Sequence, residues 1–442
     1  MKFTRFAWLI LALPLTARAD DWPQWLGPDR DAVWKETGIL DKFPEGGPKV
    51  LWRKPAAMGY AGPAVANGKV YLAEFEAKEK VNLKDPKVNN SSNKSKVEGT
   101  ERVRCLDAKT GDQLWQHADE RTYQISYPGG PRCTPTVSGG KVYFLGAEGN
   151  LLCLDADKGD VLWAKDYKKD YGATTPLWGF AGHPVVDGQR LICVVGGDDA
   201  LVVAFDKDSG KQLWKAGSAS QPGYSTPAII EAGGRKQVVV WSAESLISLN
   251  PENGEQFWAI ELKPQFGMAI MTPRKLGDHL FAAGMGGKAV MVKLAADKPA
   301  ATEVWRGTPK DAVYPVNMTP FLDGDTIYGV DTPGLLRAVE IATGKRLWET
   351  PEPVSGKKPV QTGTAFVVKN GDRYFLFNEN GELVIAKLSP EKYEEISRAK
   401  ILEPTNSSFG GHPVVWSHPA FANKCMFARN DQEIVCVSLA KE

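Results

Sequence analysis

The amino-acid sequence predicts an all-β fold, an eight-bladed β-propeller built from four-stranded antiparallel blades. Two patterns support this prediction: an eleven-residue segment that ends in Trp recurs along the chain, and a segment with Pro, an alternating run and Gly precedes the copies. Alternating runs bounded by Gly or Asp turns indicate antiparallel hairpins. Four short strands in a repeat of about 45 residues are typical of a propeller blade.

The recurring segment is clearest at residues 105–115 and 153–163, which share Cys-Leu-Asp-Ala, a Gly-Asp pair and a closing Leu-Trp. Further copies end at Trp214, Trp258 and Trp348, and weaker ones occupy residues 293–305 and 386–396. The Gly permits a tight turn, and we expect each Trp to pack between neighbouring blades with its N–H hydrogen-bonded. We assign this structural role to Trp52, Trp115, Trp163, Trp214, Trp258, Trp305 and Trp348.

Eight unit starts can be identified, which sets the number of blades. They are Pro63, Pro135, Pro184, Pro227, Pro273, Pro320, Ala365 in place of Pro, and Pro419. Residues 49–53 resemble an outermost strand with no blade before it, and residues 434–439 resemble a third strand with no fourth after it. We therefore expect the N- and C-terminal strands to share the last blade, which removes two open sheet edges.

The N-terminal residues predict export from the cytoplasm. Residues 1–19 combine Lys2 and Arg5 with an apolar run and a small-residue motif that ends at Ala19, which is typical of a signal peptide cleaved after Ala19. Residues 20–48 then form an N-terminal extension, and residues 49–442 form the propeller with an insert at 76–101 that should overhang the channel mouth. We expect a periplasmic or secreted monomer without a spanning segment.

Composition excludes some functions. Lys+Arg 54 against Asp+Glu 53 gives a net charge of +1, which argues against nucleic-acid binding. Of the six cysteines, Cys105, Cys153 and Cys436 occupy a small-residue position of the repeat, whereas Cys133 and Cys193 could pair. The five histidines show no metal-ligand spacing, and no nucleophile elbow, phosphate loop or zinc-protease motif occurs. We expect no metal and no catalytic residue.

The candidate ligand site is the mouth of the central channel. The residues that immediately precede the unit starts are Gly62, Thr134, His183, Thr226, Thr272, Thr319, Thr364 and His418. His183 and His418 stand three blades apart, so they should flank the mouth without touching and could contact an anionic or polyhydroxyl group. Trp178 or Trp416 would supply a stacking face, and Tyr127, Tyr224 and Arg132 complete the candidate set. Alternatively, these aromatic residues only pack the loops onto the propeller.

Residues 105–115 resemble the tryptophan-docking repeat of pyrroloquinoline quinone (PQQ) dehydrogenases and their non-enzymatic relatives, and the resemblance spans residues 49–440. Residues 21–30 are also similar to secreted PQQ-like propellers. In the enzymes of this family, the resemblance implies a quinone in the channel, a Ca²⁺ ion, an Asp base and often two adjacent cysteines. None of the six cysteines is adjacent to another, and no position can be matched to the Ca²⁺ ligands or the base.

We therefore expect a non-catalytic binding or scaffold module without PQQ or calcium, with a protein, peptide or glycan ligand at the channel mouth. Two alternatives remain. One is a PQQ-dependent quinoprotein dehydrogenase. The other is an outer-membrane protein assembly factor, because the chain resembles the propeller lipoprotein of the β-barrel assembly machinery; the lack of a lipid-anchor Cys after the apolar run departs from that pattern.

Overall fold

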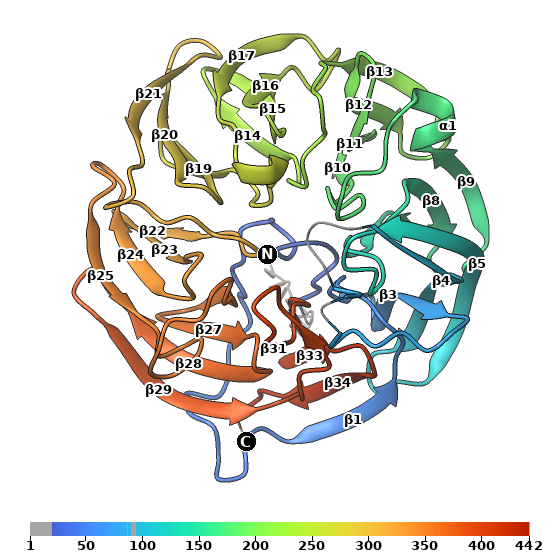
Figure 1. Ribbon diagram of the computed structural model, residues 1–442, viewed down its shortest axis with the longest axis vertical. Helices are drawn as coiled ribbons and strands as arrows, with labels where there is room; N and C mark the ends of the chain where they lie inside the picture. The colour runs from blue at the N-terminus through green and yellow to red at the C-terminus, as the bar shows by residue number, and fades with distance from the viewer. Residues whose placement is uncertain (1–19, 86, 90–93, 442) are drawn as a thin grey trace, which may run out of the picture.

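A computed structural model describes residues 20–85, 87–89 and 94–441 of the 442-residue chain, so the predicted signal peptide lies outside the described residues. Eight four-stranded antiparallel sheets surround a central axis, which confirms the predicted propeller (Figure 1). A short α-helix, α1 (Tyr167–Tyr171), a 3-10 turn, η1 (Gln265–Gly267), and a hairpin of β30 (Asn406–Ser407) and β31 (Pro413–Val414) lie between blades.

The strands of each blade follow one another from the axis to the rim. The first blade contains β2 (Ala64–Ala66), β3 (Lys69–Ala77), β4 (Ser95–Asp107) and β5 (Gln113–Ile125). The second contains β6 (Thr136–Ser138), β7 (Lys141–Leu145), β8 (Asn150–Asp155) and β9 (Val161–Asp166). The third contains β10 (Val185–Asp187), β11 (Arg190–Gly197), β12 (Ala200–Asp206) and β13 (Gln212–Ala216). The fourth contains β14 (Ala228–Ala232), β15 (Arg235–Trp241), β16 (Ser245–Leu249) and β17 (Gln256–Glu261).

The remaining blades continue the order. The fifth contains β18 (Arg274–Leu276), β19 (His279–Gly284), β20 (Lys288–Leu294) and β21 (Ala301–Arg306). The sixth contains β22 (Phe321–Asp323), β23 (Thr326–Val330), β24 (Leu336–Glu340) and β25 (Arg346–Thr350). The seventh contains β26 (Ala365–Asn370), β27 (Arg373–Asn378), β28 (Glu382–Leu388) and β29 (Tyr393–Lys400). The eighth contains β32 (Ala420–Ala422), β33 (Cys425–Arg429), β34 (Glu433–Ser438) and β1 (Val50–Pro55).

The eighth blade is closed by both ends of the chain, as the sequence predicts. Strand β1 pairs antiparallel with β34, with Trp52 opposite Cys436 and Arg53 opposite Val435. Each inner strand begins at or directly after one of the eight predicted unit starts. Each Pro therefore lies just before the inner strand, at a position where the sheet requires no backbone N–H.

The repeated Trp and Gly residues join neighbouring blades. Six of the seven docking tryptophans donate their indole N–H to a backbone carbonyl of the next blade at 2.8 to 3.1 Å, and Trp258 donates instead to Gln237 of its own blade. The turn Gly of the next blade lies against the ring face: a Cβ on Gly159 would lie 2.5 Å from a ring carbon of Trp115. The Gly is thus required by packing as well as by its left-handed φ of 77°.

The predicted insert at residues 76–101 lies between β3 and β4, and it extends their hairpin over part of its length. Ala77 pairs with Gly99, and β4 continues its pairing with β5 out to Ser95 opposite Ile125. Only the connection between β3 and β4 leaves the sheet. Asn89 in that connection donates hydrogen bonds to the Leu83 carbonyl and to Asn406 of the β30–β31 hairpin.

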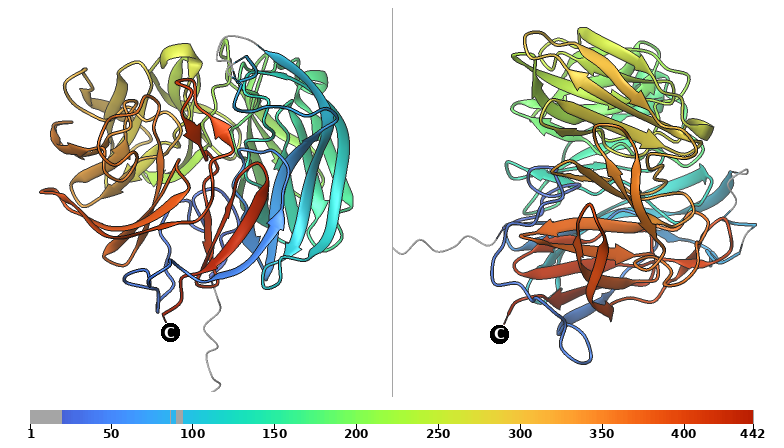
Figure 2. Two further views of the ribbon diagram at one scale, coloured as in Figure 1. Left: turned by 60° about the horizontal axis from the view of Figure 1, so that its bottom comes forward. Right: turned by 90° about the vertical axis from the view of Figure 1, so that its left-hand side faces the viewer.

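The N-terminal extension, residues 20–48, covers one face of the ring. It crosses the centre of the view in Figure 1 and runs along one side of the disc in Figure 2. Trp22 forms a bridge with Val65 in β2, and Val33 forms a bridge with Lys369 in β26. We call the side that the extension covers the extension face, and the side that carries the connections between blades the loop face.

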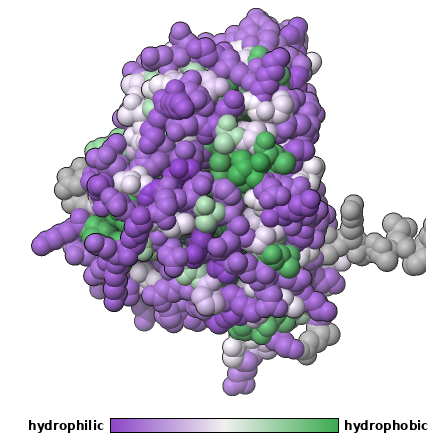
Figure 3. All heavy atoms as spheres, turned by 90° about the vertical axis from the view of Figure 1, so that its right-hand side faces the viewer, coloured by the Kyte–Doolittle hydropathy of each residue, from purple (hydrophilic) through white to green (hydrophobic). Residues whose placement is uncertain are grey.

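The side of the molecule that faces the viewer in Figure 3 is mainly hydrophilic, with separate apolar patches. The exposed apolar residues of the outermost strands are Val50, Leu51, Leu114, Val161, Leu162, Leu213, Val304 and Leu347. Isolated exposed apolar residues of this kind are ordinary on a folded protein. All six cysteines are buried and free, so the Cys133–Cys193 pair considered from the sequence is not formed.

Candidate functional site

The eight residues that precede the inner strands form a belt around the central channel. Belt residues of different blades contact one another: Thr134 Oγ1 lies 2.8 Å from His418 Nε2, and His183 Nδ1 lies 2.8 Å from Thr226 Oγ1. A Cβ on Gly62 would lie 2.5 Å from the His418 ring, so Gly in the first blade leaves the space through which His418 reaches the second blade.

Trp25 of the extension fills the centre of this belt. Its ring stacks on His183 with centroids 4.7 Å apart and meets His418 edge-to-face at 4.2 Å. The indole N–H donates to Thr272 Oγ1 at 3.0 Å. The adjoining cavity, which Trp25 and His418 line, has a volume of about 20 Å³, enough for about one water molecule.

His183 and His418 do not flank an open mouth, which corrects the expectation from blade counting. The inner strands converge on the axis, so the two rings come within 6.4 Å of each other, centroid to centroid, around Trp25. Both side chains are buried. Burial holds the pKa of His183 well below its usual value and lowers the pKa of His418 to about 4. Both imidazoles are therefore neutral at pH 7.

The other candidate residues lie on the loop face in two aromatic pairs. Trp178 packs edge-to-face on Tyr224 at 5.7 Å, and Tyr127 contacts Trp416 at 5.9 Å. Both tyrosines are buried and both tryptophans are partly exposed. The tyrosines therefore pack the loops onto the propeller, and the tryptophans keep surface that a ligand can reach.

Arg132 braces one of these loops. Its guanidinium lies 4.9 Å from the centre of the Tyr60 ring and donates hydrogen bonds to the backbone carbonyls of Ser126, Tyr127 and Gly130. Among the described residues no carboxylate pairs with Arg132, and burial lowers its pKa. Arg132 thus fixes the backbone that presents Tyr127 toward Trp416.

Glu379, which the sequence analysis did not select as a binding residue, organises the loops of the seventh and eighth blades. Its carboxylate accepts from Trp416 Nε1 at 3.1 Å and from the Thr364 backbone N–H at 3.1 Å. It also lies 2.9 Å from His412 Nε2, and His412 Nδ1 lies 2.6 Å from Ser408 Oγ. The Ser408 side chain is buried, so this Ser–His–Glu chain fixes the β30–β31 hairpin and does not present a nucleophile.

Other acidic residues at hairpin tips anchor the loop face in the same way. Glu148 accepts from the Gln124 N–H at 2.7 Å, and Glu244 accepts from the Ser220 N–H at 3.0 Å. Asp431 accepts from the Gly59 N–H at 3.2 Å. These carboxylates tie the connections between blades to the sheets and leave a fixed platform.

Two phenylalanines on this platform are exposed. Phe266 in η1 and Phe409 in the β30–β31 hairpin are 63% and 57% exposed. Phe266 has a left-handed φ of 57°, which is unfavourable for a residue with a large side chain and aims it away from the ring. The sequence analysis did not select Phe266 or Phe409 as binding candidates.

Within the described part of the chain, no group of three or more His, Cys, Asp and Glu side chains is arranged to hold a metal ion. The described residues also contain no helix of the length and apolar character needed to cross a membrane.

Comparison with known proteins points to one family. The family model described as outer membrane protein assembly factor BamB matches residues 99–295 and 243–442. The BamB protein of Shewanella oneidensis is 25% identical over 285 residues, which cover 60% of this chain and 70% of that protein.

Two solved structures share the fold. BamB from Moraxella catarrhalis superposes with a TM-score of 0.57 at 14% identity, covering 89% of this chain and 98% of that chain. A quinohemoprotein alcohol dehydrogenase, ADHIIG, from Pseudomonas putida superposes with a TM-score of 0.60 at 13% identity, covering 96% and 80%. At these identities the structural likeness concerns the fold alone.

Proposed function

The chain belongs to the family of outer membrane protein assembly factor BamB, and from that premise we propose that it is a non-catalytic scaffold that binds a protein partner in outer-membrane protein assembly. On this proposal the protein acts in the periplasm after cleavage behind Ala19. The partner docks on the loop face, and the channel is closed by the protein itself.

The observation that carries the proposal is the position of Trp25. In this propeller the belt of the central channel is occupied by a side chain of the extension, held by two imidazoles and Thr272. The belt residues therefore hold the extension in place on the ring. We infer that a partner binds at the outer surfaces of the propeller and not in the channel.

The residues of the belt do not fit a quinone cofactor. The adjoining cavity of about 20 Å³ cannot hold a tricyclic quinone beside Trp25. Calcium needs six to eight oxygen ligands, and the belt offers Thr hydroxyls, Gly and neutral His rings but no carboxylate. The site thus differs from that of a quinoprotein dehydrogenase, and we assign no oxidation step to it.

The loop face has the properties of a docking platform. Exposed aromatic side chains are enriched at the centres of protein interfaces. Phe409 extends from the hairpin that Glu379 holds through His412, and Phe266 extends from η1, where the Gln265 N–H donates to the Met285 carbonyl. A loop anchored in this way loses little conformational entropy when a partner binds. Trp178 and Trp416 add partly exposed area on the same face.

The test is site-specific photo-crosslinking in the envelope of the native host. A photoreactive phenylalanine analogue is placed at Phe266 or Phe409, and at Leu213 on the outer rim as a control, since Leu213 is also exposed. We expect the two loop-face positions to form an adduct that mass spectrometry identifies as an outer-membrane assembly protein. Adducts of equal yield at Leu213, or none at either loop-face position, would overturn the proposal.

A further inference from the structure

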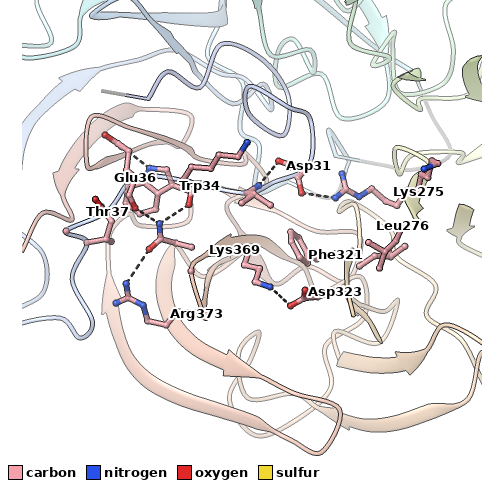
Figure 4. Close-up of a pocket in the computed structure, with 18 of the residues that line it drawn as sticks. Asp31, Trp34, Glu36, Thr37, Lys275, Leu276, Phe321, Asp323, Lys369 and Arg373 are labelled. Carbon is pink, nitrogen blue, oxygen red and sulfur yellow. Dashed lines mark hydrogen bonds and ion pairs between the residues drawn. The ribbon is translucent and has the colours of Figure 1, made fainter. Parts of the chain in front are cut away.

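A groove of about 760 Å³ lies on the extension face, opposite the proposed docking platform. Residues 31–39 of the extension form one wall, and the inner strands β18, β22 and β26 form the other (Figure 4). The volume falls in the range of sites that bind ligands.

The walls of the groove are mainly basic. Six cationic side chains and three acidic ones line it, whereas the two kinds nearly balance over the whole chain. The cationic residues are Lys35, Arg274, Lys275, Lys369, Arg373 and Lys441. Two of these cations are already paired, since Lys35 forms an ion pair with Asp29 and Lys369 forms one with Asp323.

Part of this positive charge lacks a matching carboxylate. Arg373 and Lys441 both pair with Asp41, at 2.6 and 2.5 Å, so that one carboxylate serves two cations. Among the described residues, Lys275 has no carboxylate within ion-pair distance. Arg274 donates to the backbone carbonyls of residues 30 and 31, and its buried Nε–H has no acceptor.

The floor of the groove is apolar. Phe321 and Leu322 of β22 lie between the charged walls but are only 4% and 6% exposed, so the apolar surface that a ligand can reach is that of Val33 and Leu276. Figure 4 shows Phe321 between Lys369 and Leu276, with Asp31 on the extension side. An extended polypeptide places alternate side chains on opposite sides, so one set can meet the floor while the other meets the rim.

We propose that this groove binds an acidic, extended segment of a partner polypeptide, whose carboxylates meet the rim cations and whose apolar side chains lie against Val33 and Leu276. The site is separate from the loop face, so it stands whether or not the loop-face partner is found. The extension thereby builds a second binding surface on the side of the ring that it covers.

The test measures binding of a fluorescein-labelled peptide of alternating Glu and Leu by fluorescence anisotropy, using the protein from residue 20 onward. The groove variant is Lys35→Glu with Lys275→Glu, two exposed rim residues. The matched control, Lys109→Glu with Lys211→Glu, makes the same change of charge at exposed turns outside the groove. We expect the groove variant to weaken binding by about tenfold or more and the control by less than about twofold.

Two further probes complete the test. A peptide with Gln in place of Glu should bind at least about tenfold more weakly to the wild-type protein. A second variant, Lys35→Glu with Lys275→Arg, keeps a cation at position 275 and should bind the Glu peptide more tightly than the groove variant does. Equal binding of the Gln peptide, or equal loss in the groove variant and the matched control, overturns the proposal. The proposal is also overturned if anionic lipid vesicles or citrate bind in a groove-dependent way and the acidic peptide does not bind. That result would mean that the groove cations bind a lipid surface or a small anion.

Discussion

Trp25 stacks on His183 with ring centroids 4.7 Å apart and an angle of 21° between the planes. The contact joins the N-terminal extension to the residue that precedes the inner strand of the third blade. Because His418 of the eighth blade meets the same indole edge-to-face, one side chain links the third and eighth blades. The extension is therefore part of the folded core of the ring.

Removal of the Trp25 ring should destabilise the protein. Trp25→Ala removes the ring that packs against two imidazoles, and we expect the free energy of unfolding to fall by about 3 kcal/mol. Trp25→Phe keeps a ring but loses the hydrogen bond to Thr272, with an expected loss of about 1 kcal/mol. Denaturant unfolding at pH 7 measures both. An alanine variant as stable as wild type would show that Trp25 does not hold the extension.

The buried histidines predict a loss of stability in acid. The pKa of His418 is about 4 in the folded protein and near 6.5 when unfolded, so the unfolded chain binds the proton more readily. The stabilisation is present above pH 6.5 and is lost as the pH falls toward 4, by about 3 kcal/mol for His418. His183 shifts in the same direction.

One variant tests whether His418 causes the loss of stability in acid. His418→Gln keeps a polar group beside Thr134 but cannot titrate, so its free energy of unfolding should fall less steeply between pH 6.5 and 4 than that of wild type. Denaturant unfolding across this range compares the slopes. Parallel curves for the two proteins would mean that other groups carry the acid sensitivity.

The packing of each docking Trp should require a Gly in the turn of the next blade, so that a larger residue there lowers the stability of the protein. Gly159→Ala places a methyl group 2.5 Å from the Trp115 ring at a φ of 77°, and we expect a loss of about 3 kcal/mol or more. Gly188→Ala is the control, because Gly188 also has a positive φ of 58° but no atom near its Cβ position. The control should lose about 1 kcal/mol. Thermal unfolding measures the stability of both variants. Equal losses of stability would mean that backbone strain alone, and not contact with the Trp115 ring, explains the effect of Gly159→Ala.

Strand β1 should protect the edge of the eighth blade. A chain that begins at Lys54 lacks most of β1 and exposes β34, whereas a chain that begins at Lys49 lacks the extension but keeps β1. We expect the shorter chain to form more oligomers or insoluble material than the longer one, because an open edge can pair with another chain. Light scattering after gel filtration measures the difference. A monomeric chain from Lys54 would argue against the closure.

Ser408 should be unreactive although it lies in a hydrogen-bonded chain with His412 and Glu379. Its side chain is buried and the Glu379 carboxylate is already engaged by Trp416 and the Thr364 N–H. We expect no labelling by a fluorophosphonate probe in mass spectrometry. Labelling that disappears in Ser408→Ala would reveal a hydrolase site.

The periodic parts of the fold could be predicted from the sequence because each blade repeats the same local requirements. The Pro residues mark strand starts and the Gly–Trp spacing marks the outer hairpin. The sequence located the insert at 76–101 but not the length of its strands, because β4 from Ser95 alternates between partly and well exposed residues in an extended hairpin. Polar strands of this kind have a weak sequence signal.

The candidate site was harder to predict because its contacts join residues far apart in sequence. Trp25 lies 247 positions from its hydrogen-bond partner Thr272, and no local pattern indicates that pairing. The two histidines were identified by comparing equivalent positions in the repeat, but their burial depends on Trp25. The Glu379–His412 contact likewise forms only when the seventh blade packs beside the β30–β31 hairpin.

The most direct test of the scaffold function is a quinone-binding measurement. The purified protein is dialysed against PQQ and Ca²⁺, bound quinone is measured by absorbance, and dye reduction is followed with alcohols and aldose sugars. Because Trp25 fills the belt, the account predicts neither stoichiometric PQQ binding nor dye reduction. One PQQ bound per chain with substrate-dependent turnover would contradict it.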